Sequence, residues 1–323
     1  MAATKPASST TPSSLNFLKE GLLLPGRNRR LFAAIFMILV AWISLLLVAN
    51  ELGVEPLKLE VGRDMDTLMS TDPRGPDYAH LVRETLDDYR VLFLAGAAYL
   101  VSLDITGSVI QLVSLFAAVT TYSGDGEVHT FGALLGRAKQ QLKGAVLTVA
   151  FVCALKTAAV VLLLALSTLV AFLAFRRYHY HGLFLAGCLV LLVAFVFYVF
   201  LSFLCSLAVV VAVDESAARR HHGAGAVGQA WQLVKGRQRR AMLFVSVMSV
   251  LAAVFRPVYW QAKICARGNM ASGAVLLGVL YTVQMAAVEL FQDCALIAFY
   301  YECKGRSAQE SETEYAKLSI QDA

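Results

Sequence analysis

The sequence is poor in charged residues, since Asp, Glu, Lys and Arg make up only 16% of its 323 residues. A soluble domain usually carries about 25% charged residues. Hydrophobic residues reach 58%, and the mean hydropathy is +0.63. A water-soluble fold has no means of hiding so much apolar surface, so we expect lipid to surround most of the chain.

Motifs for catalysis and cofactor binding are also missing. The sequence contains no Ser-His-Asp context, no P-loop, no H-E-x-x-H and no C-x-x-C spacing. His179 and His181, or His221 and His222, would give a metal two imidazoles without the third and fourth ligands that a zinc site needs. We therefore expect no enzymatic activity, no metal and no cofactor. Nucleic acid is not an expected partner, because the basic residues lie beside apolar runs and form no separate patch.

Six apolar runs are long enough to cross a bilayer, which takes about 20 residues of helix. The fifth run is the weakest, because Arg256 and Pro257 arrive early. The expected spans cover about residues 31–49, 91–118, 144–174, 183–213, 241–258 and 274–300. They define a membrane domain over residues 31–303, preceded by a disordered tail at 1–14 and an interfacial helix at 15–30. Residues 304–323 are expected to form a disordered cytosolic tail.

The basic residues are distributed unequally between the two sides of the expected spans. Seventeen Lys and Arg flank them on the side of the termini and ten on the other side, where the first loop also contains ten acidic residues. Because cytosolic loops carry the excess of Lys and Arg, both termini are predicted to be cytosolic. The Ala-, Ser-, Thr- and Pro-rich start resembles a plastid transit peptide, but a cytosolic tail explains it as well. We favour the endomembrane system or the plasma membrane over a plastid membrane.

The first loop, of about forty residues, is the longest segment expected outside the membrane. The spacing of Tyr78, Leu81, Leu86 and Tyr89 predicts a helix that begins after Pro76 and Asp77 and leads into the second span. The rest of the loop is expected to be a solvated acidic surface.

A short motif precedes two of the spans in the same relation to the lipid: Gly-Arg-Asn-Arg-Arg at residues 26–30 and Gly-Arg-Gln-Arg-Arg at residues 236–240. Apolar residues spaced by three and four also precede each odd-numbered span, which is typical of amphipathic helices. Their expected faces are Phe17, Leu18, Gly21 and Leu22; Phe131, Leu134, Leu135, Ala138 and Leu142; and Val227, Ala230, Trp231 and Val234.

This pattern predicts an all-α polytopic fold of three transmembrane hairpins, each preceded by a short interfacial helix. The alternative is that the repeat is accidental, since arginine is common at any cytosolic helix start. In either case the expected partners are the lipid bilayer and the anionic headgroups of its cytosolic leaflet. The candidate headgroup contacts are Arg27, Arg29, Arg30, Arg237, Arg239 and Arg240.

Four ionisable residues fall inside the expected spans: Asp104, Lys156, Glu289 and Asp293. A charge at the centre of a membrane helix costs about 2.5 to 3.5 kcal/mol on insertion scales, so such groups are usually paired or functional. At 1.5 Å per residue, Asp104 and Lys156 both lie about 20 Å deep. Glu289 and Asp293 are four residues apart and therefore share one helical face.

Two hypotheses follow from this intramembrane cluster. In one, Asp104, Lys156 and Glu289 line a path for a proton or another cation. In the other, Asp104 and Lys156 form a structural salt bridge, and the two carboxylates of the last span lie near the membrane surface. A polar cavity that reaches Glu289 would favour transport, and a dry bundle with Asp104 on Lys156 would favour the structural role.

Several segments resemble known families. Residues 15–21 and 24–32, Ser114 to Ala117 with Thr121 to Gly124, Trp231 with Lys235 to Arg237, and the end from Phe291 to Lys304 are similar to landmarks of a plant family of six-span membrane proteins of uncharacterised function. The last block also resembles the end of a bacterial membrane domain that is sometimes fused to glycerophosphodiester phosphodiesterases. The resemblance implies a six-span fold and transfers no catalytic residues, because the phosphodiesterase domain has no counterpart here.

The sequence therefore favours a non-enzymatic membrane organiser or interaction partner. The alternative is a secondary transporter or channel for a small solute or ion that uses Asp104, Lys156 and Glu289.

Overall fold

The computed structural model describes residues 16–72, 75, 78–123, 131–175, 181–214, 223–268 and 270–321. The expected tail at 1–14 lies outside these residues, as do His179, His221 and His222. Within the described part, the regular secondary structure is helical throughout. The helices are α1 (Asn16–Arg27), α2 (Arg29–Ala49), the π-helix η1 (Asn50–Val54), α3 (Glu55–Ser70), α4 (Tyr78–Ser123), α5 (Phe131–Phe175), α6 (His181–Asp214), α7 (Ala224–Val234), α8 (Gln238–Arg267) and α9 (Ala271–Gln321).

Six helical segments are long and apolar enough to cross a membrane, as the sequence predicts. They lie in α2 with its continuation, α4, α5, α6, α8 and α9. The fifth differs from expectation, because α8 does not end near Pro257 but continues to Arg267. Proline removes one backbone hydrogen bond, but a lipid-exposed break in the helix would leave more backbone groups without partners.

The first loop is mostly helical, whereas the sequence predicted a helix only in the part that leads into the second span. Helix α2 continues without a break into η1 and then α3, and α3 packs against α4. Helix α4 begins at Tyr78, as its spacing predicts, and has 46 residues. At 1.5 Å per residue it is about 69 Å long, more than twice the hydrocarbon thickness of about 30 Å. The acidic N-terminal part of α4 therefore extends beyond the lipid together with α3.

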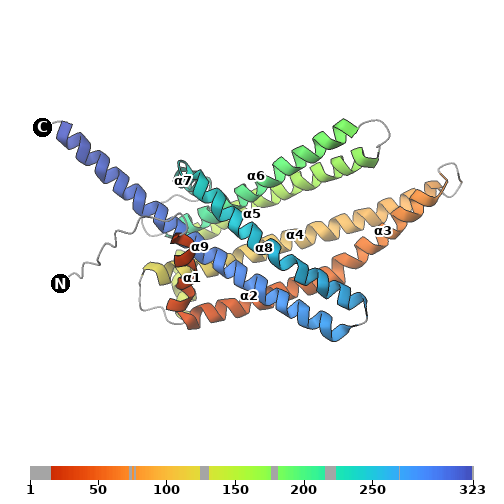
Figure 1. Ribbon diagram of the computed structural model, residues 1–323, viewed down its shortest axis with the longest axis horizontal. Helices are drawn as coiled ribbons and strands as arrows, with labels where there is room; N and C mark the ends of the chain where they lie inside the picture. Colours follow the sequence, from red (N-terminus) through yellow and green to blue (C-terminus); the bar gives the residue numbers. More distant parts are fainter. Residues whose placement is uncertain are drawn as a thin grey trace.

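Consecutive long helices pack side by side: α3 with α4, α5 with α6, and α8 with α9 (Figure 1). The C-terminal ends of α3, α5 and α8 and the N-terminal ends of α4, α6 and α9 lie at one end of the molecule (Figure 1). We call it the open end, because the pairs spread apart toward it. Helices α1 and α7 lie at the other end, which we call the base end (Figure 1).

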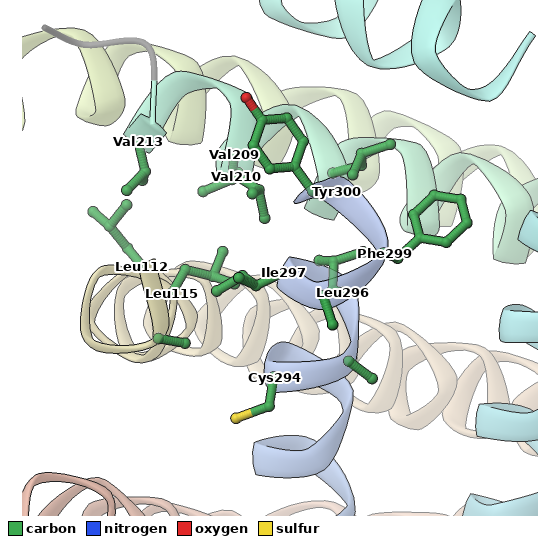
Figure 2. Packing of buried hydrophobic residues seen from close by; sticks show 14 of the residues in the cluster. Leu112, Leu115, Val209, Val210, Val213, Cys294, Leu296, Ile297, Phe299 and Tyr300 are labelled. Carbon is green, nitrogen blue, oxygen red and sulfur yellow. The ribbon is translucent and has the colours of Figure 1, made fainter. Parts of the chain in front are cut away.

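The apolar core lies at the base end. Residues 115–118 of α4, 203–213 of α6 and 293–300 of α9 are buried without interruption. Figure 2 shows the segment of α9 from Cys294 to Tyr300 between α4 and α6, with Ile297 beside Leu112 and Leu115. Toward the open end, by contrast, Leu185, Leu189 and Val193 of α6 are each more than 60% exposed. Lipid is the medium that covers such side chains in a membrane.

Helix α1 packs against α9 through Phe17, Gly21 and Leu24, all of them buried. At Gly21 a Cβ atom would lie 2.6 Å from the Cα atom of Ala295, so only glycine permits this contact. Leu22, expected on the same face, is instead exposed. The expected position of the face was therefore wrong at Leu22, because helix-to-helix contact selects Leu24 in its place.

Helix α7 packs mainly against α6, and its buried residues are Ala226, Ala230 and Val234. Trp231, expected on the apolar face, is 44% exposed and meets the ring of Phe200 edge-on at 6.2 Å. The small alanines face the neighbouring helix because they permit close approach. The expected middle amphipathic segment, from Phe131 to Leu142, forms the start of α5 and not a separate helix, and its side chains lie outside the described part.

The C-terminal segment also differs from expectation. Helix α9 continues to Gln321, so residues 304–321 are helical where a disordered tail was expected. Helix-favouring residues such as Ala, Glu, Gln and Lys are frequent in this segment, and it contains no proline.

Candidate functional site: a polar cavity between the spans

A cavity of about 420 Å³ lies between α2, α4, α5, α6 and α9. The four ionisable residues identified from the sequence, Asp104, Lys156, Glu289 and Asp293, all line it. Its position along α4, α6 and α9 is just on the open-end side of the apolar core. The fold therefore gathers groups that are up to 189 positions apart into one membrane-embedded site.

The floor of the cavity is a hydrogen-bonded polar layer. Gln111 of α4 donates from Nε2 to the Asp293 carboxylate of α9 at 3.4 Å and to the Ser206 hydroxyl of α6 at 3.2 Å. Asp293 is only 5% exposed. One amide thus connects three spans directly above the apolar core. In the sequence, Asp293 stands out as a charge within an apolar run, but Gln111 and Ser206 do not, because a lone Gln or Ser in a span gives no distinctive signal.

The wall formed by α4 and α5 contains Asp104 and Lys156, both half-buried. The Thr157 hydroxyl donates to the Asp104 carboxylate at 3.4 Å. Asp104 and Lys156 are both described residues, and no salt bridge joins their side chains. The direct ion pair that the sequence suggested is therefore not formed. The two charges line the same open space instead.

Helix α9 presents Glu289 and Asp293 to the cavity on one face, as their spacing predicts. Gln292 and Tyr281 of the same helix also line it. Across the cavity, α2 contributes Trp42. The described lining thus carries three carboxyl groups and one ammonium group, together with aromatic and amide side chains.

Below the core, a cluster of polar contacts closes the base end. Asp214, the last residue of α6, accepts hydrogen bonds from the Tyr300 hydroxyl at 2.8 Å and the Tyr301 hydroxyl at 2.7 Å, and it pairs with Lys304. The ring of Tyr301 stacks on Tyr122 of α4 at 4.5 Å. We call Asp214, Tyr300, Tyr301 and Lys304, with the neighbouring Glu302 and Cys303, the base cluster.

Two of the six expected headgroup contacts belong to this closure. Arg240 donates to the Glu302 carboxylate at 2.6 Å, and Arg237 donates to the backbone carbonyl of Cys303 at 2.7 Å. Both are therefore engaged with α9. The other four, Arg27, Arg29, Arg30 and Arg239, are exposed at the same end of the molecule.

A second polar cluster, which sequence analysis missed, joins η1 and α3 to α8. Lys263 pairs with Glu55 at 2.8 Å and with Glu51 at 3.4 Å, and the Tyr259 hydroxyl donates to Glu51 at 2.6 Å. These partners are more than 200 positions apart, so no spacing rule reveals them. The π-helical turn of η1 lies where both Glu51 and Glu55 reach α8.

In the part of the chain that the structure describes, no group of three or more His, Cys, Asp or Glu is placed to hold a metal ion. All six cysteines have free thiols.

The fold and the site define an α-helical protein of the integral membrane type, in which five of the six candidate spans line a polar cavity beside the apolar core. The chain belongs to the family described as a domain of unknown function (DUF8558), whose model matches residues 13–319. Neither the curated proteins nor the solved structures contain a significant match. The similarity to plant six-span proteins and to the bacterial fusion domain stays a prediction.

Proposed function

We propose that this protein is a non-enzymatic transporter that binds a small organic cation in the cavity between its spans. The observation that carries the proposal is the convergence of Asp104, Glu289 and Asp293 on one cavity, whose described lining contains a single ammonium group, that of Lys156. Carboxylates in a low-dielectric site attract a cation strongly, and they are costly to bury without one.

The size and lining of the cavity favour an organic cation. A volume of about 420 Å³ falls within the range of about 300 to 1,000 Å³ typical of small-molecule sites. Trp42 and Tyr281 supply aromatic faces, and such rings attract ammonium groups. The acidic residues would provide charge, and the rings would provide shape.

The asymmetry of packing supports alternating access as the mechanism. The cavity lies between a spread open end and a base end closed by the apolar core and the base cluster. Transport would require a second state in which the base cluster separates and the open end closes. The conformation described here then corresponds to a state closed at its base.

Orientation is part of the proposal. We place both termini and the base cluster on the cytosolic side, because the excess of Lys and Arg lies there. The cavity would then face the lumen or the exterior, in the endomembrane system or the plasma membrane.

The finer architecture follows from the same placement. We propose three hairpins, with α1, the start of α5 and α7 near the cytosolic headgroups. Arg27, Arg29, Arg30 and Arg239 are exposed and would contact anionic lipids, which attract each nearby basic residue by about 1 kcal/mol. This basic rim is what favours the second function, a membrane organiser acting through lipid contacts.

Uptake of radiolabelled tetramethylammonium into proteoliposomes tests the transport proposal. This ion keeps its charge at every pH and does not leak across bilayers as a neutral amine does. We expect wild-type protein to catalyse uptake, and Glu289→Gln and Asp104→Asn to reduce it at least about tenfold, a loss equivalent to about 1.4 kcal/mol.

Glu84→Gln serves as the matched control, because Glu84 is an exposed carboxylate of α4 far outside the cavity lining. Its uptake should equal that of the wild type. No wild-type uptake, or wild-type uptake in both cavity variants, would refute the proposal.

A further inference from the structure

A second hollow, of about 250 Å³, lies between α6 and α8, and we call it the side groove. Its lining is mainly apolar and includes Phe203 of α6, Phe244, Met248 and Ala252 of α8, and Leu296 of α9. Both helices are candidate membrane spans, so the groove lies at the depth of lipid chains. Val250 and Val254, also on α8, are at least 60% exposed, as expected for neighbours of lipid.

The side groove adjoins the polar cavity. Ser202, Ser206 and Gln292 line both hollows. Helix α6 otherwise contacts α8 and α9 sparsely compared with its own partner α5. A molecule with a polar part in the cavity and an apolar part between α6 and α8 would pass these three shared residues.

We infer that the ligand is an amphipathic ammonium compound whose apolar chain lies in the side groove and whose charged end lies among the cavity carboxylates. The inference rests on the proposed function and names the substrate class of the same site. Charge complementarity identifies the headgroup, because Asp104, Glu289 and Asp293 outnumber Lys156. The apolar lining of the groove identifies the chain.

The arrangement also defines the route of entry. A chain-bearing cation partitions into the bilayer and reaches the groove sideways, between α6 and α8. Its chain then exchanges lipid for side chains of similar polarity, and its headgroup gains the carboxylates. A small cation without a chain would have to enter from the open end.

The test compares dodecyltrimethylammonium with tetramethylammonium, which share a headgroup and differ in the chain. Equilibrium binding of each radiolabelled cation is measured with the full-length protein in phosphatidylcholine nanodiscs, and empty nanodiscs supply the background. Ala252→Phe places a ring in the groove, and Ala253→Phe places the same ring on an exposed position one residue away.

We expect Ala252→Phe to weaken the binding of dodecyltrimethylammonium at least about tenfold, because the ring occupies the space of the alkyl chain. Ala253→Phe should bind it as the wild type does. The binding of tetramethylammonium should be the same in both Phe variants as in the wild type. Glu289→Gln should weaken the binding of both cations. Equal melting temperatures for the two Phe variants establish that folding is intact; if Ala252→Phe is unstable, Ala252→Leu replaces it.

Three outcomes separate the inference from the function beneath it. The inference is overturned if a folded Ala252 variant binds dodecyltrimethylammonium as tightly as the wild type does. The proposed function would still stand in that case if tetramethylammonium binding depends on Glu289. The inference is also overturned if Glu289→Gln leaves the affinity for dodecyltrimethylammonium unchanged, because the headgroup then binds elsewhere. Binding of neither cation, or of both without dependence on Glu289, overturns the proposed function as well.

Discussion

At the scale of single residues, close contacts explain positions that composition leaves unmarked. Gly21 is an ordinary glycine in the sequence, but in the structure it lets α1 lie against the backbone of Ala295. The spacing of Phe17 and Gly21 predicts that they share a face, and it does not reveal which neighbour covers that face. Asp104 and Glu289 stand out as charges in apolar runs, whereas Gln111 gains its role only from Asp293 and Ser206.

Gly21→Leu is expected to lower the free energy of unfolding by about 1 to 3 kcal/mol, the usual cost of overpacking a close contact. The added side chain would push α1 away from α9, because backbone atoms of Ala295 occupy its place. Thermal unfolding in detergent, followed by circular dichroism, measures the effect. Gly26→Leu is the control, since nothing lies within 4 Å of a Cβ there, and equal melting temperatures would contradict the prediction.

At the scale of helices, α9 holds the base end together. Its segment from Phe299 to Lys304 contacts α1 through Phe17, α6 through Asp214 and α8 through Arg240. The sequence marks this segment only as a family landmark. Its cohesive role depends on these three helices converging on it, which no local pattern specifies. The continuation of α8 through Pro257 was likewise missed, because lipid changes the relative cost of ending a helix.

Arg240→Gln is expected to loosen the base end, because Glu302 would lose a charged partner at 2.6 Å. Removing one partner of a half-buried charged hydrogen bond costs about 1 to 3 kcal/mol. Reaction of Cys303, which is 3% exposed, with a small maleimide should become faster as the base cluster opens. Arg239→Gln removes an equal charge from an exposed neighbour and should leave labelling unchanged; faster labelling in both variants would show a general charge effect.

At the scale of the whole molecule, the spread of the helix pairs creates the cavity and its asymmetry. The six apolar helices follow from the sequence, because length and hydropathy are local properties of the chain. The arginine placement predicts an orientation. The depth of Asp104 and Lys156 also follows from counting residues. The absence of a direct bond between them, and the open space that both line, depend on how α4 and α5 are placed relative to α9.

Orientation can be tested by adding an N-glycosylation site, because the natural sequence has none. Met69→Asn precedes Ser70 and Thr71 at the end of α3 and adds an acceptor at the open end, where Met69 is 63% exposed. Val128→Asn adds one between α4 and α5, on the opposite side. Translation with microsomes should give an endoglycosidase-sensitive mass shift for Met69→Asn alone, and a shift for Val128→Asn alone would reverse the proposed topology.

By itself the sequence determined that the chain is helical, has six segments long and apolar enough to cross a membrane and carries four ionisable groups within them, because these properties depend on neighbours along the chain. Only the tertiary structure decided that the four groups face one cavity, that Arg237 and Arg240 bind α9, and that Glu51 meets Lys263. Some of those contacts join residues more than 200 positions apart. Helical periodicity fixes which face of a helix a residue occupies, but it does not specify which other helix that face will contact.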